Sequence, residues 1–155
     1  MPRERRNTAE SVADREFLIT RVFEAPARLL FEAHSKPEHV QQWFGPKGFS
    51  LPLCEIDFRV GGRLRFGMRA PDGTDLRPFG GEYLEIVPNE RIVYTNGWDD
   101  DEKMIITVTF VETGGLTTLV IHTLFASIAQ RDEHLGRGYA GGVGEGLDRL
   151  EEFLR

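Results

Sequence analysis

The feature that most constrains this sequence is a series of short segments, between Leu51 and Phe125, in which apolar and polar residues alternate. Residues 54–60 read CEIDFRV and residues 63–69 read RLRFGMR, so every second side chain in the first segment is apolar, as are Leu, Phe and Met in the second. A period of two is typical of strands with one buried and one solvent-exposed face. Turn residues separate the segments by only a few positions, and connections this short join antiparallel neighbours. The pattern predicts one antiparallel sheet with a single apolar face.

About seven strands are expected in this sheet. The first precedes the alternating series, because Glu16–Phe23 is rich in β-branched and aromatic residues and stops shortly before a proline. Gly, Pro, Asn and Asp residues divide the later series into further segments. These segments are residues 51–60, 63–69, 80–87, 91–98, 104–112 and 116–125.

Helical patterns lie on both sides of the long β series. Pro26 and the apolar stripe after it predict a short helix, and Ser35 with Glu38 has the spacing of a capping box that opens a second one. At the C-terminus, apolar residues at i, i+4, i+7 and i+11 predict an amphipathic helix that begins near Gly138 or later. Six glycines within residues 136–146 disfavour a helix, so this stretch is either a loop or a place where glycine allows close backbone approach.

These elements predict an α+β fold, with a curved antiparallel sheet of about seven strands, two short helices after the first strand, and a long C-terminal helix over the sheet. Residues 1–15 contain both charges and almost no apolar side chains, so we expect a mobile leader followed by a single domain over residues 16–155. A helix about 10 Å across cannot cover seven strands. The gap between helix and sheet is therefore expected either to fill with large side chains or to hold a ligand.

Composition and charge exclude several classes of function. The chain has 19 basic and 25 acidic residues and a formal net charge of −6, without the basic surplus that is typical of nucleic-acid binding. Its one cysteine forms no internal disulfide or thiolate zinc site, and its four histidines follow no metal-binding spacing, so we expect no metal and no cofactor. No apolar run suits a membrane span or a signal peptide, which predicts a cytoplasmic protein.

Motifs along most of the chain resemble one known family. They run in order from RVFEAP at 21–26 through WFGPKGF at 43–49 and EIVP at 85–88 to LDRL at 147–150. In these motifs the sequence is similar to the Activator of Hsp90 ATPase homologue family of the SRPBCC (START, or Bet v 1-like) superfamily. The resemblance implies a helix-grip fold, in which an antiparallel sheet holds a long C-terminal helix around an apolar cavity. Relatives often carry a large aromatic residue at the position of Val143, which is smaller here.

The inner faces of the expected elements supply a candidate ligand-binding lining. On the strand at 91–98, polar side chains share the parity of the apolar face, as in small-molecule sites. Glu82 also shares parity with two apolar residues, unless a bulge at the preceding glycine pair turns it outward. The candidate lining is Trp43, Phe66, Met68, Glu82, Tyr94, Asn96, Trp98, Tyr139, Val143 and Leu147. For each residue the alternative is a packed core with satisfied polar groups.

Three functions are compatible with this lining. We expect first a protein that binds a small hydrophobic or aromatic molecule, with no catalytic residue assigned. The alternative is an enzyme of the polyketide cyclase or dehydrase type, in which Glu82, Asn96 and Tyr94 would polarise or deprotonate the substrate. The resemblance also implies a co-chaperone-like interaction domain, but that activity is associated with larger proteins that have an additional N-terminal domain, so no chaperone partner is expected. An exposed edge strand could pair with a second copy of the chain, so the sequence neither predicts nor excludes a homodimer.

Overall fold

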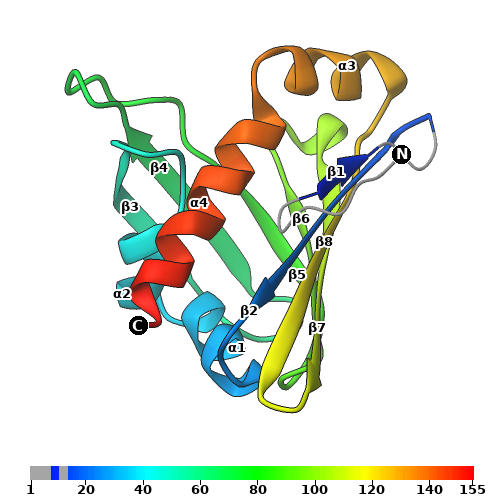
Figure 1. Ribbon diagram of the computed structural model, residues 1–155. Helices are drawn as coiled ribbons and strands as arrows, with labels where there is room; N and C mark the ends of the chain where they lie inside the picture. The colour runs from blue at the N-terminus through cyan, green and yellow to red at the C-terminus, as the bar shows by residue number, and fades with distance from the viewer. Residues whose placement is uncertain (1–7, 11–13) are drawn as a thin grey trace.

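The computed structural model describes residues 8–10 and 14–155, whose arrangement is shown in Figure 1. Over these residues, eight strands form one antiparallel sheet in the order β1-β2-β8-β7-β6-β5-β4-β3. The strands are β1 (Thr8–Glu10), β2 (Glu16–Phe23), β3 (Ser50–Ile56), β4 (Arg63–Arg69), β5 (Phe79–Val87), β6 (Arg91–Asn96), β7 (Met104–Thr113) and β8 (Leu116–Leu124). The helices are α1 (Ala27–Ser35), α2 (Pro37–Trp43), the short 3-10 helix η1 (Asp100–Glu102), α3 (Ile128–Gly136) and α4 (Tyr139–Phe153).

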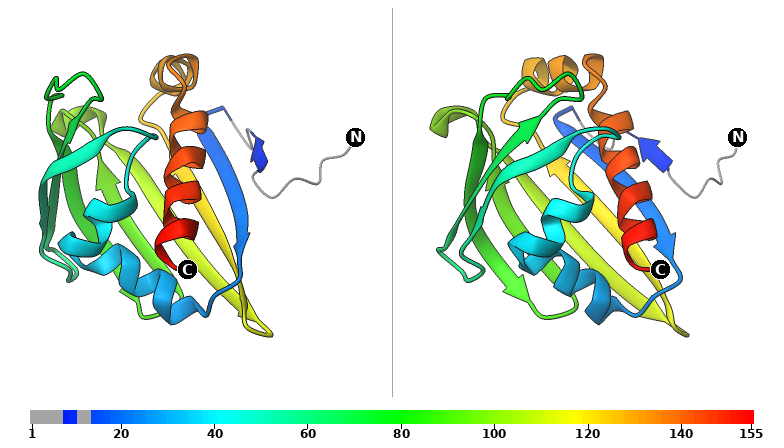
Figure 2. Two further views of the ribbon diagram at one scale, coloured as in Figure 1. Left: turned by 60° about the vertical axis from the view of Figure 1, so that its left-hand side comes forward. Right: turned by 90° about the vertical axis from the view of Figure 1, so that its left-hand side faces the viewer.

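The expected helix-grip α+β architecture is confirmed. Strands β3 to β8 pair in sequence order, as short connections between antiparallel strands favour, and β2 pairs with β8 although the two are far apart in the sequence. Figure 2 shows that the sheet curves around α4, with α1 and α2 across one end. The fully buried side chains include Phe23, Leu30, Leu147 and Leu150 at this end, and Phe125 and Thr123 near the start of α4.

The predicted N-terminal leader contains one short element. Residues 8–10 form β1, an edge strand in which Ala9 lies opposite Ile19 of β2. Residues 1–7 and 11–13 lie outside the described residues, so the mobility of the leader stays a prediction.

The boundary between α1 and α2 is set by Pro37 and not by the capping box that we predicted. Lys36 is the N-cap residue of α2 and has an extended backbone, which is the conformation preferred before proline. Ser35 ends α1 instead, and its hydroxyl donates a hydrogen bond to the carbonyl oxygen of Glu32 at 2.9 Å. Pro37 lies in the first turn of α2, where its missing N–H has no intrahelical partner to lose.

Two helices follow β8, where the sequence predicted one. The first, α3, is capped by the side chain of Ser127, which accepts a hydrogen bond from the backbone N–H of Gln130. Gly138 separates the two helices with a φ of +88°, a left-handed conformation that glycine adopts without steric cost. No residue of α3 is buried, so no apolar stripe marks this helix in the sequence.

Two glycines of α4, Gly142 and Gly146, lie where another part of the chain contacts the helix. A Cβ atom at Gly146 would lie 3.5 Å from the backbone nitrogen and oxygen of Gly45, and one at Gly142 would lie 3.4 Å from the ring of Pro46. Of the two alternatives for the glycine-rich stretch, the helix is therefore confirmed from Tyr139 onward, and a Cβ at Gly142 or Gly146 would make ordinary van der Waals contact with the neighbouring segment.

Candidate functional site

A cavity of about 600 Å³ lies between the concave face of the sheet and α4. Strands β4 to β7 turn their apolar alternate side chains toward it, and α1 and α2 contribute residues at its inner end. On the helix side, the residues that face it from α4 are small or apolar, among them Gly142, Val143 and Gly146. The sheet is wider than α4, so the space that the helix cannot fill remains open.

The structure brings together nine of the ten residues predicted for the lining. They come from the end of α2, from β4, from β6 and its following turn, and from α4. Leu147 lies at the buried end, and Trp98 lies at the mouth with 46% of its surface exposed. The nine are Trp43, Phe66, Met68, Tyr94, Asn96, Trp98, Tyr139, Val143 and Leu147.

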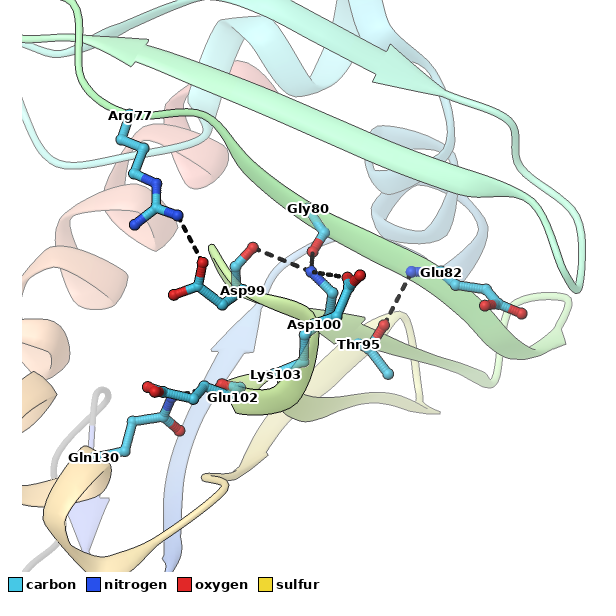
Figure 3. Close-up of polar contacts among 10 residues, drawn as sticks. Arg77, Gly80, Glu82, Thr95, Asp99, Asp100, Glu102, Lys103 and Gln130 are labelled. Carbon is cyan, nitrogen blue, oxygen red and sulfur yellow. Dashed lines mark hydrogen bonds and ion pairs between the residues drawn. The ribbon is translucent and has the colours of Figure 1, made fainter.

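Glu82 is the exception and lies on the outer face of the sheet. It is exposed, it faces away from the cavity, and its backbone N–H donates to the hydroxyl of Thr95 (Figure 3). We expected a bulge, if any, at Gly80-Gly81, but β5 pairs regularly with β4 there. The register of β5 against β6 shifts between Tyr83 and Glu85. Leu84, which shares the parity of Glu82, is itself 44% exposed, and the shift reverses the parity before Ile86, so neither apolar residue indicates an inward Glu82.

The same register places Tyr83 in the cavity wall, a residue that the sequence analysis did not select. Tyr83 is 4% exposed and lies directly opposite Tyr94 of β6. Phe79, four residues earlier on β5, lines the wall as well. The alternation from Phe79 to Tyr83 was the sequence signal that could have identified Tyr83 as inward-facing. It was hidden because the residues after the shift indicate the opposite face.

Asn96 is the buried polar residue of the wall that lacks a protein partner. It is 9% exposed, and its Oδ1 atom has no hydrogen-bond partner among the described residues. Tyr94 precedes it by two residues and lines the same wall. Burial raises the pKa of the Tyr94 hydroxyl well above its usual value, so this group stays protonated at neutral pH.

A second site residue that the sequence analysis left unassigned is His34, at the inner end of the cavity. Its Nδ1 lies 2.7 Å from the carbonyl oxygen of Leu30, so Nδ1 carries the proton and donates it. The ring packs edge-on against Trp43 and Phe110. Burial lowers the pKa of His34 from 6.5 to about 4, which makes the side chain neutral at pH 7.

Aromatic stacking forms one side of the cavity mouth. The rings of Trp98 and His134 stack with centroids 5.8 Å apart, which joins the turn after β6 to α3. The indole N–H of Trp98 donates to the carbonyl oxygen of Arg77 at 3.3 Å. The guanidinium of Arg77 in turn forms an ion pair with Asp99 at 2.7 Å (Figure 3).

Backbone oxygens near the mouth are bound by two further side chains (Figure 3). Gln130 of α3 donates through its Nε2 to the carbonyl oxygen of Glu102 at 2.6 Å. Lys103 donates through its Nζ to the carbonyl oxygen of Gly80 at 2.8 Å. The turn between β6 and β7 is thus held to both α3 and β5.

Residues 44–47, which we call the flap, are fixed to α4 on the other side of the mouth. Nη1 of Arg149 lies 3.1–3.2 Å from three successive carbonyl oxygens, those of Phe44, Gly45 and Pro46. The backbone N–H of Lys47 donates to the carboxylate of Glu145 at 3.0 Å. Charge-assisted bonds of this kind are stronger than neutral ones, so the flap is a fixed part of the wall.

The ionisable groups of the described residues show no metal-binding arrangement. No three His, Cys, Asp or Glu side chains in residues 8–10 and 14–155 are placed to hold a metal ion. Burial raises the pKa of the Cys54 thiol to about 11, so it is protonated at neutral pH. Within the same residues, no helix has the length and the apolar character needed to cross a membrane.

An antiparallel sheet that curves around a C-terminal helix, with an apolar cavity between them, defines the helix-grip class of α+β domains. Within that class, the chain belongs to the family described as Activator of Hsp90 ATPase homolog 1-like protein, whose sequence model matches residues 24–155. No curated protein matches the sequence.

Solved structures of several bacterial proteins are similar to this one. A Chromobacterium violaceum protein is 31% identical with a TM-score of 0.78, over 90% of this chain and 96% of that chain. A Nitrosomonas europaea protein is 25% identical with a TM-score of 0.84, over 92% of this chain and 95% of that one. CalU16 from Micromonospora echinospora, at 20% identity and a TM-score of 0.64 over 97% and 84% of the two chains, shares the fold.

Proposed function

We propose that this protein binds a small, largely apolar molecule in the cavity between the sheet and α4. The observation that carries the proposal is a cavity of about 600 Å³ with apolar walls in which Oδ1 of Asn96 is buried without a partner among the described residues. Pockets that bind small molecules have volumes of about 300–1,000 Å³ and a few polar groups on apolar walls. Nearly all buried polar atoms in folded proteins are hydrogen-bonded, so an unpaired one that borders a cavity favours a bound molecule.

The small α4 side chain at the cavity also supports the proposal over the alternative of a core filled by the chain's own side chains. Val143 of α4 faces the cavity with little side-chain volume. A tightly packed domain would place a larger residue there, because protein interiors are close-packed and empty volume forfeits dispersion contacts. This favours a cavity that is kept open for an occupant.

A mechanism of the polyketide cyclase type would lack the carboxylate that we assigned to it, that of Glu82. Glu82 is exposed on the outer face of the sheet, so it cannot act on a molecule in the cavity. Tyr94 remains protonated at neutral pH because burial raises its pKa, which disfavours it as a general base. The geometry therefore supports binding better than acid–base catalysis. The cytoplasmic location, the homodimer and the absence of a chaperone partner stay predictions.

The first test is mass spectrometry of the freshly purified full chain, measured under native and under denaturing conditions. We expect a discrete additional mass that is lost on denaturation. A ligand library is then titrated while tryptophan fluorescence is followed, because Trp43 lines the cavity and Trp98 lies at its mouth. Binders are expected to change the emission of Trp43 in a Trp98→Phe variant. A protein that shows neither an additional mass nor a binder in the library would contradict the proposal.

A further inference from the structure

One polar atom of the cavity wall is buried without a hydrogen-bond partner among the described residues. The hydroxyl of Tyr139 is 3.1 Å from Thr123 Oγ1, Nδ1 of His34 bonds to a carbonyl oxygen, and the indole N–H of Trp43 bonds to another. Each of these groups is used by the fold itself. Oδ1 of Asn96, in contrast, is buried with no partner among the described residues.

The chemistry of an amide oxygen restricts which group can supply its missing hydrogen bond. Oδ1 of Asn96 accepts hydrogen bonds and cannot donate them, so the missing group must be a donor. The neighbours of Asn96 on the inner face are Tyr94 on its own strand and Met104 directly opposite on β7. These side chains present mainly apolar surface, so the rest of the bound molecule must be apolar to bury well.

Charge restricts the molecule further. The charged residues at the cavity are Glu102, Glu133 and Arg137, and all three are exposed at the mouth. The side chains that line the inner part are apolar, aromatic or neutral. An ionised group placed there would lose its hydration without gaining a counter-charge, which strongly disfavours its burial.

We infer that the ligand is a neutral molecule with an apolar ring body and a hydroxyl or N–H group, and that this group donates a hydrogen bond to Oδ1 of Asn96. The inference rests on the proposed function, since it requires a ligand in the cavity. It makes Asn96 the residue that selects between ligands with and without a donor. A water molecule bound to Asn96 would satisfy the same atom without giving this selectivity, and the experiment separates the two cases.

The test measures two ring compounds that differ only in the donor, 2-naphthol and 2-methoxynaphthalene, by isothermal titration calorimetry with the full chain. We expect 2-naphthol to bind about tenfold more tightly, which is the size of one net hydrogen bond. In the Asn96→Leu variant, which has a similar volume and no acceptor, the ratio of the two affinities should fall to about one through weaker binding of 2-naphthol. Because this substitution removes an unpaired buried acceptor, its thermal unfolding midpoint is expected to stay at or above the wild-type value.

A matched control replaces a polar residue on the outer face of the neighbouring strand. Thr107 of β7 has the parity opposite to the buried residues of that strand, and Thr107→Val should keep the wild-type preference for 2-naphthol. Protonated 2-naphthylmethylamine, a donor that carries a positive charge at pH 7, should bind at least tenfold more weakly than 2-naphthol.

Several outcomes would overturn the inference. Equal affinities of the two neutral compounds for the wild-type protein, or a preference for 2-naphthol that persists in Asn96→Leu, would show that Asn96 does not bind a donor. In both cases the two compounds still bind, so the proposed function stands while the inference fails. Equal or tighter binding of the amine would remove the requirement for a neutral ligand. Failure of both neutral compounds to bind would exclude the ring body.

Discussion

Buried polar side chains of this protein fall into two groups that have different consequences. Arg21, 4% exposed on the inner face of β2, forms an ion pair with Asp148 of α4 at 2.7 Å and a 3.4 Å hydrogen bond to the carbonyl oxygen of Gly144. His34 donates to a carbonyl oxygen within its own helix. These contacts stabilise the fold, since an unpaired buried polar group costs about 1–3 kcal/mol, although Nε and Nη1 of Arg21 have no hydrogen-bond partner among the described residues. Oδ1 of Asn96 has none either, and it differs from the Arg21 atoms in its position in the cavity wall, where the proposed ligand would supply one.

His34 makes the stability of the protein depend on pH in a defined window. Its pKa in the folded state is about 4, against 6.5 for the ordinary side chain. Between these values the unfolded chain binds a proton that the folded chain does not, so the free energy of unfolding falls as the pH is lowered. A difference of this size corresponds to about 3 kcal/mol, fully lost only below the lower pKa. Urea unfolding at several pH values between 4 and 7 measures it.

The His34→Phe variant tests the assignment of this pH dependence. An aromatic ring that does not titrate should flatten the decline between pH 6.5 and 4, although it loses the hydrogen bond to Leu30. His122 lies on the outer face beside Glu16 and serves as the control, so His122→Gln should keep the decline. A decline of equal size in wild type and His34→Phe would assign it to other groups.

At the scale of elements, backbone geometry decides where each strand and helix turns its side chains. The register shift between Tyr83 and Glu85 places the residues before it and after it on different parities of β5. At the other end of the chain, Gly138 separates α3, which buries no residue, from α4, which packs against the cavity and the flap. Both features involve one or two residues, and both decide which side chains reach the cavity.

Two glycines at the start of α4 separate conformational effects from steric ones. A Cβ at Gly138 or at Gly141 would meet no atom within 4 Å, but Gly138 has a φ of +88° and Gly141 lies inside the helix. Gly138→Ala should therefore lower the free energy of unfolding by about 1–2 kcal/mol, because alanine is strained in the left-handed region. Gly141→Ala should raise it by up to about 1 kcal/mol through higher helix propensity. Urea unfolding of both variants checks the signs, and a shift in the same direction for both would refute this account.

At the scale of the whole molecule, the cavity follows from the mismatch between one helix and a wide sheet. Helix α4 covers the end of the sheet at which Leu147 and Leu150 are buried, and α1 and α2 close that end. Toward α3 the distance is spanned by the flap and by the Trp98–His134 stack, and Tyr139 is the large side chain that α4 contributes there. The fold is therefore stable with an open volume beside its packed core.

A larger side chain on α4 that fills this volume should raise the stability of the fold and lower the affinity for the ligand. Val143→Phe would place a ring in the cavity, where its additional apolar surface would stabilise the fold by up to about 1 kcal/mol. We expect the affinity for any ligand found by the library screen to fall at least tenfold in calorimetric titrations. The control Val111→Phe adds the same ring on the exposed outer face of β7 and should leave binding unchanged. Unchanged affinity in Val143→Phe would place the ligand elsewhere.

Local patterns in the sequence were sufficient to predict the strands β2 to β8, the helices α1 and α2, and most of the cavity lining. Alternation with a period of two and turn residues act within a few positions, so they are readable in one segment at a time. Tyr94 and Asn96 could be selected in this way because they share one strand face with apolar neighbours, and Val143 because it belongs to the apolar stripe of the C-terminal helix.

Where the strand pairing shifts, tertiary contacts determine which side chains reach the cavity, and these positions could not be predicted from the sequence. The outward position of Glu82 and the inward position of Tyr83 follow from how β5 pairs with two different strands. The neutrality of His34 and the unpaired oxygen of Asn96 depend on residues that are distant in sequence and close only after folding. Local patterns carry no information on such contacts, because pairing register and desolvation are properties of the assembled sheet and helices.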